Sequence, residues 1–484
     1  KSNADAILQR RTRMPVLQVE GRMPVQANHV YIIPPNQELR LNDGHLELQA
    51  PTRTRGPHVA IDLFFRALAQ VHTLRAVGIV LSGTGADGAL GLKRIKERGG
   101  VALVQAPHEA EFADMPNAAI ATGAADFVLP VADMPQRLMD LWSNARRIWL
   151  PTLAERGDPV AAPPSAADAQ RAEQSLQDVM ALLRVRTGHD FRHYKRATVL
   201  RRIERRLQVC GVPDLNAYSA YLRTHAEETP ALLQDMLISV TNFFRDREAF
   251  EALEREVLPA LFKDRALGEP VRVWVAGCAT GEEAYSISML LREAASAPGH
   301  SAAAPIPLQV FATDIDDRAL AVARAGLYAP SIATDVAPVR LAQHFTRADG
   351  GYRVAKAVRE PVLFAAHNVL RDPPFSRLDL ICCRNLLIYV GREAQASILG
   401  MFRFALRPGG YLFLGTSESP DAAGNLFTLV DKKHRIYQAN PQVHTVRHLP
   451  LLSASTAERA AAMLPGPALR EAGRPGVADL HTRA

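Results

Sequence analysis

Cysteine is scarce in this chain of 484 residues, which has only four, at positions 210, 278, 382 and 383. None of them lies in a Cys-x-x-Cys pair or near histidine at the spacing of a zinc site, so we expect no metal centre. Such sparse cysteine fits the reducing cytoplasm, where we expect the protein to act. Long apolar runs are missing too. No stretch reaches about 18 apolar residues and no signal peptide precedes the first predicted strand, so we expect no membrane insertion.

A strong charge of one sign is also missing, because the net charge at neutral pH is only +7. This mild excess permits an acidic partner but does not identify one. The length predicts about three domains. The first residue is Lys rather than Met, and we expect the natural protein to begin upstream of it.

Composition divides the first half of the chain into three segments. Residues 1–145 alternate short apolar runs with helical patterns, which predicts a doubly wound α/β domain. Residues 146–170 include a stretch rich in Pro, Ala and Asp without hydrophobic periodicity, which predicts a linker. Residues 171–265 show helical patterns throughout and predict an all-α domain.

The second half returns to an α/β pattern. Residues 266–440 alternate strand and helix signals as a Rossmann-like domain would. The pattern is interrupted at about 325–364, where "GGYRV" and "REPVLF" predict a small antiparallel insertion. Residues 441–484 are rich in Ala, Pro, Arg and Gly, and we expect a mobile tail.

The segment "VAGCATGEEAYS" (275–286) places a glycine loop between a predicted strand and a predicted helix. A dinucleotide fold would carry G-x-G-x-x-G here. Instead, Glu282 and Glu283 begin the helix, where they would repel a pyrophosphate and suit a cation. Asp314 ends the next predicted strand, where it could accept hydrogen bonds from ribose hydroxyls. A ligand with a ribose, a positive centre and no phosphate describes S-adenosylmethionine better than NAD or ATP.

The same acids have plainer explanations. The two glutamates would complement the helix dipole in any case, and Asp314 could cap the following helix. The loop alone leaves both interpretations open.

Five motifs, of which the first is the glycine loop itself, make the pattern specific. "AGCATGEEAYS", "FATDID", "AAHNVL" and "LICCRNLLIYV" follow in this order over residues 276–390, after "ISVTNFFRDREAF" at 238–250. Together they resemble the CheR family of chemotaxis-receptor glutamate methyltransferases, over roughly residues 175–440. The resemblance implies S-adenosylmethionine as cofactor and S-adenosylhomocysteine as product. It implies a cofactor site made of Ser239, Thr241, Arg245, Glu283, Asp314, Asn368, Val369, Arg384 and Asn385.

The resemblance also implies a role for each side chain of the cofactor site. Thr241 and Arg245 would close over the cofactor, with Arg245 near its carboxylate. Glu283 would bind the methionine amino group and Asp314 the ribose. Asn368 and Val369 would flank the adenine. Arg245 as a surface ion-pair residue remains an alternative.

Arg384 and Tyr389 are the catalytic residues that the resemblance implies, lining the methyl-transfer face together with Asn385. Arg384 could orient an incoming carboxylate by a charge-assisted hydrogen bond. A glutamate carboxylate is ionised near neutral pH and needs no general base, so we expect no catalytic histidine. Tyr389 as a core aromatic remains an alternative. The family commonly has Pro where this chain has Ala284, a change that should preserve the turn.

The segment "RHYKRATVLRRIERRLQ" (192–208) predicts a helix with one apolar stripe and a basic remainder. The basic side chains expected to face outward are Lys195, Arg201, Arg202, Arg205 and Arg206. Nucleic acid would suit such a face, but no interleaved aromatic platform accompanies it. A solvated basic face is a further alternative. The resemblance implies docking on the acidic, glutamate-bearing helical bundle of receptors, and strand addition of a receptor tail at the insertion.

A rival motif, "DPPF" at 372–375, resembles the signature of methyltransferases that act on planar amino or amide nitrogens. It precedes the strand "LDLICC" instead of following it, so we expect a turn. Methylation of nucleic acid or small molecules therefore remains one alternative function. A cofactor-binding sensor or scaffold without turnover is another.

The segment from "AVGIVLSGTGADGA" to "AADFVL" (76–129) resembles the catalytic domain of CheB-type receptor methylesterases. The resemblance implies that Asp87 is the acid of a Ser-His-Asp triad, whereas an Asp-Gly turn is the structural alternative. The family's Ser and His would lie upstream, and the histidines here do not take that place: His29, His58, His72 and His108. An Asp alone activates no nucleophile, so we expect no esterase activity from these 484 residues. The whole resembles a CheB/CheR fusion, which further signalling domains at either end would fit.

Overall fold

The computed structural model describes residues 3–50, 59–148, 150, 165–237, 240–263, 265–266, 268–296, 306–348 and 351–442. The predicted tail (441–484) lies almost wholly outside these ranges, as does the middle of the predicted linker. Within the described ranges, no helix combines the length and the apolar character needed to cross a membrane.

The largest sheet has seven strands in the order β14-β10-β9-β15-β16-β18-β17. Their bounds are β9 (Val271–Ala276), β10 (Leu308–Asp314), β14 (Val362–Ala366), β15 (Leu378–Cys383), β16 (Leu406–Leu414), β17 (Phe427–Asp431) and β18 (Ile436–Ala439). The first five in this order pair in parallel, and the last two are antiparallel. Because parallel strands end at one edge, the loops after β9, β10, β14 and β15 converge there.

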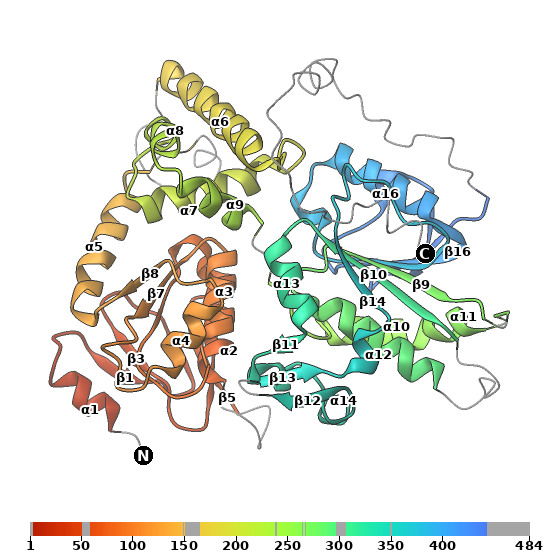
Figure 1. The fold of residues 1–484 in the computed structure, drawn as a ribbon. Helices are drawn as coiled ribbons and strands as arrows, with labels where there is room; N and C mark the ends of the chain where they lie inside the picture. Colours follow the sequence, from red (N-terminus) through yellow and green to blue (C-terminus); the bar gives the residue numbers. More distant parts are fainter. Residues whose placement is uncertain are drawn as a thin grey trace, which may run out of the picture. The chain divides into compact units, whose positions relative to one another are not determined.

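Helices cover both faces of this sheet (Figure 1). Residues of α10 (Arg247–Glu256), α11 (Leu258–Phe262) and α12 (Glu282–Ala295) share one core with Val273 and Val275 of β9. Residues of α16 (Arg392–Ala405) share the other core with Trp274. Successive side chains of a strand point to opposite faces, which is why neighbours in β9 enter different cores. The predicted Rossmann-like architecture is confirmed.

The predicted antiparallel insertion is confirmed as a three-stranded sheet of β11 (Leu327–Tyr328), β13 (Gly351–Val354) and β12 (Phe345–Ala348). Short helices accompany it: α13 (Asp317–Ala325) before it, then η4 (Pro330–Thr334), α14 (Pro338–His344) and α15 (Lys356–Arg359). The assignment of "REPVLF" to this insertion was wrong. Its apolar residues form β14, which pairs in parallel with β10 and completes the main sheet.

The all-α domain consists of α6 (Ala166–Thr187), α7 (Arg196–Cys210), α8 (Leu215–Thr224) and α9 (Glu228–Met236). Helix α6 begins inside the predicted linker because Ser165 accepts a hydrogen bond from the Asp168 N–H and caps it. The apolar stripe of α7 is buried as predicted, in one core with α6, α8 and α9.

The N-terminal part is an α/β domain, as predicted. A parallel sheet of β6 (Val77–Val80), β7 (Val101–Gln105) and β8 (Phe127–Leu129) alternates with helices. These helices are α2 (Ala60–His72), α3 (Ala89–Glu97), α4 (Asp114–Ala121) and α5 (Met134–Ala145). Before them lie α1 (Ala4–Gln9), the parallel pair β1 (Val16–Gln18) and β3 (Val30–Ile32), and an antiparallel sheet of β2 (Arg22–Pro24), β5 (His45–Gln49) and β4 (Glu38–Asn42).

Candidate active site

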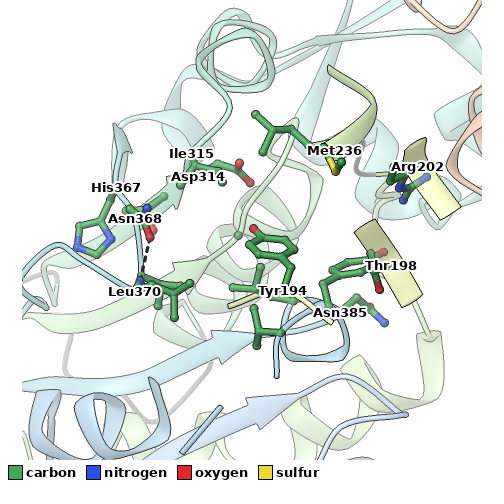
Figure 2. A pocket seen from close by; sticks show the side chains of 17 residues that line it. Tyr194, Thr198, Arg202, Met236, Asp314, Ile315, His367, Asn368, Leu370 and Asn385 are labelled. Carbon is green, nitrogen blue, oxygen red and sulfur yellow. Dashed lines mark hydrogen bonds between the residues drawn. The ribbon is translucent and has the colours of Figure 1, made fainter. Parts of the chain in front are cut away.

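A pocket lies at the carboxyl edge of the seven-stranded sheet, between the strand-end loops and the all-α domain (Figure 2). Five of the residues that the sequence singled out for the cofactor or for catalysis line it: Asp314, Asn368, Val369, Asn385 and Tyr389. Helices α7 and α9 contribute the opposite wall, with Thr198 and Met236. Thr241, Arg245, Glu283 and Arg384 are not among the lining residues, and Ser239 lies outside the described residues.

The glycine loop after β9 forms the floor of this pocket. Gly277 lines it with φ +75°, and a Cβ there would meet Leu386 at 3.4 Å. The N–H groups of Gly277 and Cys278 both donate to the carbonyl of Thr313, at 2.8 and 2.9 Å. These bonds tie the loop to the end of β10. A side chain at Gly277 would therefore strain the backbone that lines the pocket.

Asp314 holds the same loop from the neighbouring strand. Its carboxylate accepts hydrogen bonds from the Ala279 N–H (2.8 Å) and the Asp316 N–H (3.0 Å). Burial raises the pKa of Asp314, and these two bonds oppose the rise. The alternative role as helix cap belongs instead to Asp316, which accepts from the first N–H groups of α13. Each Asp314 oxygen keeps a further lone pair for a ligand hydroxyl.

Glu283 and Arg384 form a buried ion pair behind the pocket. Arg384 Nη1 lies 3.6 Å from Glu283 Oε2, and Arg384 Nη2 lies 2.8 Å from Asp246 Oδ2. Burial raises the pKa of Glu283 to about 7, although Arg384 and Arg245 counteract the rise. The guanidinium also lies over the rings of Phe250 and Phe413.

The Arg384 side chain has no exposed surface. Its position therefore favours holding Glu283 over the predicted contact with an incoming carboxylate.

Asn385 enters the pocket from a strained turn, with φ +60°. Its N–H donates to Glu418 (2.9 Å), which also accepts from the N–H groups of Gly415 and Ile388 at 2.7 and 3.2 Å. Within the described part of the chain, the buried Asn385 Oδ1 has no hydrogen-bond partner. An unpaired buried acceptor of this kind favours a ligand that donates to it.

Several residues that build the site, Tyr194 among them, were not predicted from the sequence to lie there. Tyr194 lines the pocket and bridges to Val390, while the Lys195 N–H donates to the Tyr389 carbonyl at 2.8 Å. Glu418, which holds the turn at Asn385, was missed as well. No local pattern marks these residues, because tertiary packing alone brings them to the sheet edge.

The "DPPF" segment, expected to be a turn, is a bend and irregular backbone that lies directly after a turn at 369–371. Asp372 accepts a hydrogen bond from the Asn368 N–H at 2.7 Å. Phe375 is buried and stacks on Phe311 at 4.4 Å between ring centroids. None of residues 372–375 lines the pocket.

The prediction of an outward basic face on α7 was wrong for three of its five residues. Arg202, Arg205 and Arg206 are buried, with exposed fractions of 4%, 0% and 8%. Lys195 is exposed and Arg201 half-buried. The helical period identifies the side of α7 that faces its own core. It does not show whether carboxylates of another layer cover the opposite side.

Asp87 of the N-terminal domain lies at the start of α2. Its two oxygens accept hydrogen bonds from the N–H groups of Ile61 (3.0 Å) and Asp62 (2.9 Å). Burial raises the pKa of the adjacent Asp62 to about 6, and the charge of Asp87 adds to this. His58 lies outside the described residues. Across the described ranges, no cluster of three His, Cys, Asp or Glu side chains could hold a metal ion.

Family models match three consecutive segments of the chain. Residues 1–138 match the CheB methylesterase, residues 174–237 the all-alpha domain of the CheR methyltransferase, and residues 239–436 its SAM binding domain.

Relatives match the whole chain or its second half. An uncharacterized 104.1 kDa protein of Rhodobacter capsulatus is 40% identical over 90% of this chain, which spans only 46% of that protein. The putative methyltransferase Cher3 of Pseudomonas putida is 33% identical over 52% of this chain and 91% of its own length. The chemotaxis protein methyltransferase of Escherichia coli is 34% identical over 52% of this chain and 86% of its own length.

Among solved structures, the CheB methylesterase catalytic domain of Thermotoga maritima is 24% identical. It covers 28% of this chain and 75% of its own, with a TM-score of 0.27. The match to the curated methyltransferases over most of their length, together with the motifs at the sheet edge, establishes the family. The chain belongs to the CheR methyltransferase family, with an S-adenosylmethionine-binding domain that follows a CheB methylesterase domain.

Proposed function

We propose that the chain transfers the methyl group of S-adenosylmethionine to glutamate side chains of chemotaxis-type receptors in the cytoplasm. The observation that carries this proposal is the sheet-edge pocket with Asp314 and Asn385, backed by the buried pair Glu283–Arg384. Asp314 in this pocket suits the ribose of the cofactor, and Glu283 behind the pocket suits its positively charged amino group.

The residues present fit the cofactor. Asp314 would accept hydrogen bonds from the ribose hydroxyls, and Asn368 and Val369 would flank the adenine. Glu283 would pair with the methionine amino group. The conformation of Gly277 leaves room for a ligand against the loop backbone. When bound, S-adenosylmethionine supplies an electrophilic methyl group on a sulfonium.

The protein's own contribution to this reaction is orientation. The acceptor carboxylate is ionised near neutral pH, so it needs no base to become a nucleophile. Arg384 fixes the position of Glu283, and Tyr389 and Val390 tie the methyl-transfer side of the pocket to the all-α domain through Lys195 and Tyr194. Fixed geometry of this kind lowers the barrier by positioning and by excluding water.

We also propose that these 484 residues do not hydrolyse receptor esters unaided. Both oxygens of Asp87 accept hydrogen bonds at the start of α2, which supports a structural role. Detectable hydrolysis of a methylated receptor by this chain would contradict the proposal.

The test is transfer of labelled methyl from S-adenosylmethionine to a cytoplasmic receptor fragment with glutamate-bearing helices. We expect base-labile label, as carboxyl esters give, and its loss in Asp314→Ala. The matched control is Asp317→Ala, an exposed acid three residues away, which should keep full transfer. Base-stable label would indicate an acceptor other than a carboxylate. Binding of S-adenosylhomocysteine without any transfer would support a sensor.

A further inference from the structure

Two arginines of α7, Arg202 and Arg205, are covered by the esterase-like domain, here residues 3–50 and 59–148. Arg205 Nε donates to the Gly100 carbonyl at 3.0 Å, and the same guanidinium pairs with Asp126. One turn earlier, Arg202 donates to the carbonyl of Glu97 at the end of α3. Further along, the Asn144 side chain donates to the carbonyl of Leu207 at 3.1 Å. Two of the five residues that were predicted to dock receptors are thus occupied by another domain of the same chain.

A buried group of four charges forms the centre of this interface. Lys96 and Asp126 come from the esterase-like domain, and Arg205 and Asp235 from the all-α domain. Lys96 Nζ lies 3.5 Å from Asp126 and 3.7 Å from Asp235, while Arg205 pairs with both carboxylates.

Each domain therefore contributes one cation and one anion that already pair with each other. Unpaired buried charges are costly. Because each pair stays intact if the domains part, this interface can open without leaving a single charge unpaired.

The interface extends to the mouth of the pocket. Arg202 lines the pocket together with Tyr389 and Thr198 (Figure 2). From α3, Arg94 donates to Asn242 (3.4 Å) and to Glu97 (2.8 Å), next to the predicted cofactor residue Thr241. Glu97 is only 7% exposed.

Glu97 reaches this side of the pocket through Arg202. Its carbonyl accepts a hydrogen bond from Arg202, which lines the pocket together with Tyr389. Burial raises the pKa of Tyr389, and the charge of Glu97 adds to this rise. The end of α3 therefore lies next to the wall of the pocket that Arg202 forms.

We propose that the esterase-like domain has a further function, as an intramolecular inhibitor of methyl transfer. The last turn of α3 covers Arg202, on the side of the pocket that also carries Tyr389 and that an acceptor helix must reach. An acidic receptor helix would compete for Arg202 and Arg205 and displace the domain. This proposal rests on the proposed methyl transfer to receptor glutamates.

The first test opens the interface by charge reversal in the full chain. The variant Lys96→Glu places an acid opposite Asp235 of the all-α domain, so repulsion should favour the open form. Methyl transfer to the receptor fragment should rise about fivefold or more in kcat/KM, because the competent fraction of the protein increases. Affinity for S-adenosylhomocysteine should change less than about twofold, since the cofactor side is untouched. The control, Arg10→Glu, makes the same charge change at an exposed position of the same domain and should leave kcat/KM unchanged.

A second variant guards against misfolding of the first. Arg94→Ala/Glu97→Ala removes the α3 contacts near the pocket, keeps the net charge, and introduces the best helix former. It should also raise kcat/KM, whereas Arg10→Ala/Glu20→Ala, at exposed positions, should not. An active wild type whose rate matches that of both interface variants would overturn the proposal.

If neither the wild type nor the interface variants transfer methyl groups, the proposed function is contradicted. Binding of the receptor fragment then tests the inhibitory role separately. Labelled receptor fragment should then bind the interface variants at least about fivefold more tightly than the wild type. Equal binding would overturn the inhibitory role.

Discussion

Two loops of similar composition occupy equivalent places in the two α/β domains. "GTGADGA" (83–89) joins β6 to α3, and "CATGEEA" (278–284) joins β9 to α12. In each, a glycine with a positive φ starts the helix: Gly88 at +91° and Gly281 at +93°. The acid precedes this glycine in the first loop and follows it in the second. That small difference in order gives the two acids different surroundings.

The surroundings separate a structural carboxylate from one that is available to a ligand. Asp87 bonds two backbone N–H groups at the start of α2, an arrangement that stabilises a helix N-terminus. Glu283 is largely buried, with Arg384 at 3.6 Å and the charge of Arg245 nearby, and its pKa of about 7 shows that these two cations do not offset the cost of burial. A buried acid with such incomplete compensation is a candidate for binding a cationic group.

The largest effect should come from Asp314, which supports the second loop. Asp314→Ala removes two hydrogen bonds to the loop backbone and the acceptor for the ribose. Hydrogen bonds to charged groups contribute roughly 1.5–3 kcal/mol each, so affinity for S-adenosylhomocysteine should fall about 100-fold. Isothermal titration calorimetry measures this, with Asp317→Ala as the unaffected control. A tenfold change in affinity corresponds to about 1.4 kcal/mol. A loss of affinity below about threefold would therefore contradict the role of Asp314 in binding the ligand, and would leave it no more important there than we expect Asp87 to be.

The next effect is a pH dependence that belongs to Glu283. A cationic amino group binds the ionised carboxylate, and a folded pKa of about 7 means that acid protonates it. Between pH 7.5 and 5.5 the ionised fraction falls roughly 25-fold, and affinity for S-adenosylhomocysteine should fall with it. Titrations over this range should show the slope in the wild type, and Glu283→Gln should remove it. An identical slope in both chains would assign the titration to another group.

Stability of the unliganded chain should respond with the opposite sign. The pKa of Glu283 rises from 4.5 in the unfolded chain to about 7 on folding, so the native state binds more protons between these values. The contribution of this group to stability is therefore present below pH 4.5 and is lost as the pH rises to 7. Glu283→Gln should be stabilised relative to the wild type at pH 7.5 more than at pH 5, measured by chemical unfolding.

Much of this architecture could be predicted because it depends on patterns within short segments of the sequence. Buried parallel strands such as β9 and β15 are short apolar runs, and their ends must meet at one sheet edge. Asp314 could therefore be placed at this edge from its position at a strand end, and the resemblance to the CheR family added Asn368 and Asn385 to the same site. The order of motifs along the chain indicated the family.

What could not be predicted depends on packing between distant segments. Tyr194 reaches the pocket through a bridge to Val390, and no periodicity in its own segment indicates that. The burial of Arg205 follows from carboxylates 79 and 30 residues away, at Asp126 and Asp235. An amphipathic pattern specifies one face of a helix and leaves the partner of the other face open.

The smallest effect should come from Asp87. Asp87→Ala removes the two bonds at the start of α2, and losing such a cap costs about 1–2 kcal/mol. Amide hydrogen exchange of residues 60–72 should therefore accelerate roughly 5- to 30-fold if local opening is affected. Asp114→Ala, an exposed acid in the first turn of α4, is the control and should leave exchange in α2 unchanged. Affinity for S-adenosylhomocysteine should stay within about twofold in both variants, since neither touches the sheet-edge pocket. Weakened cofactor binding in Asp87→Ala would contradict the separation of the two loops, because it would mean that the acid before the glycine also supports the ligand site.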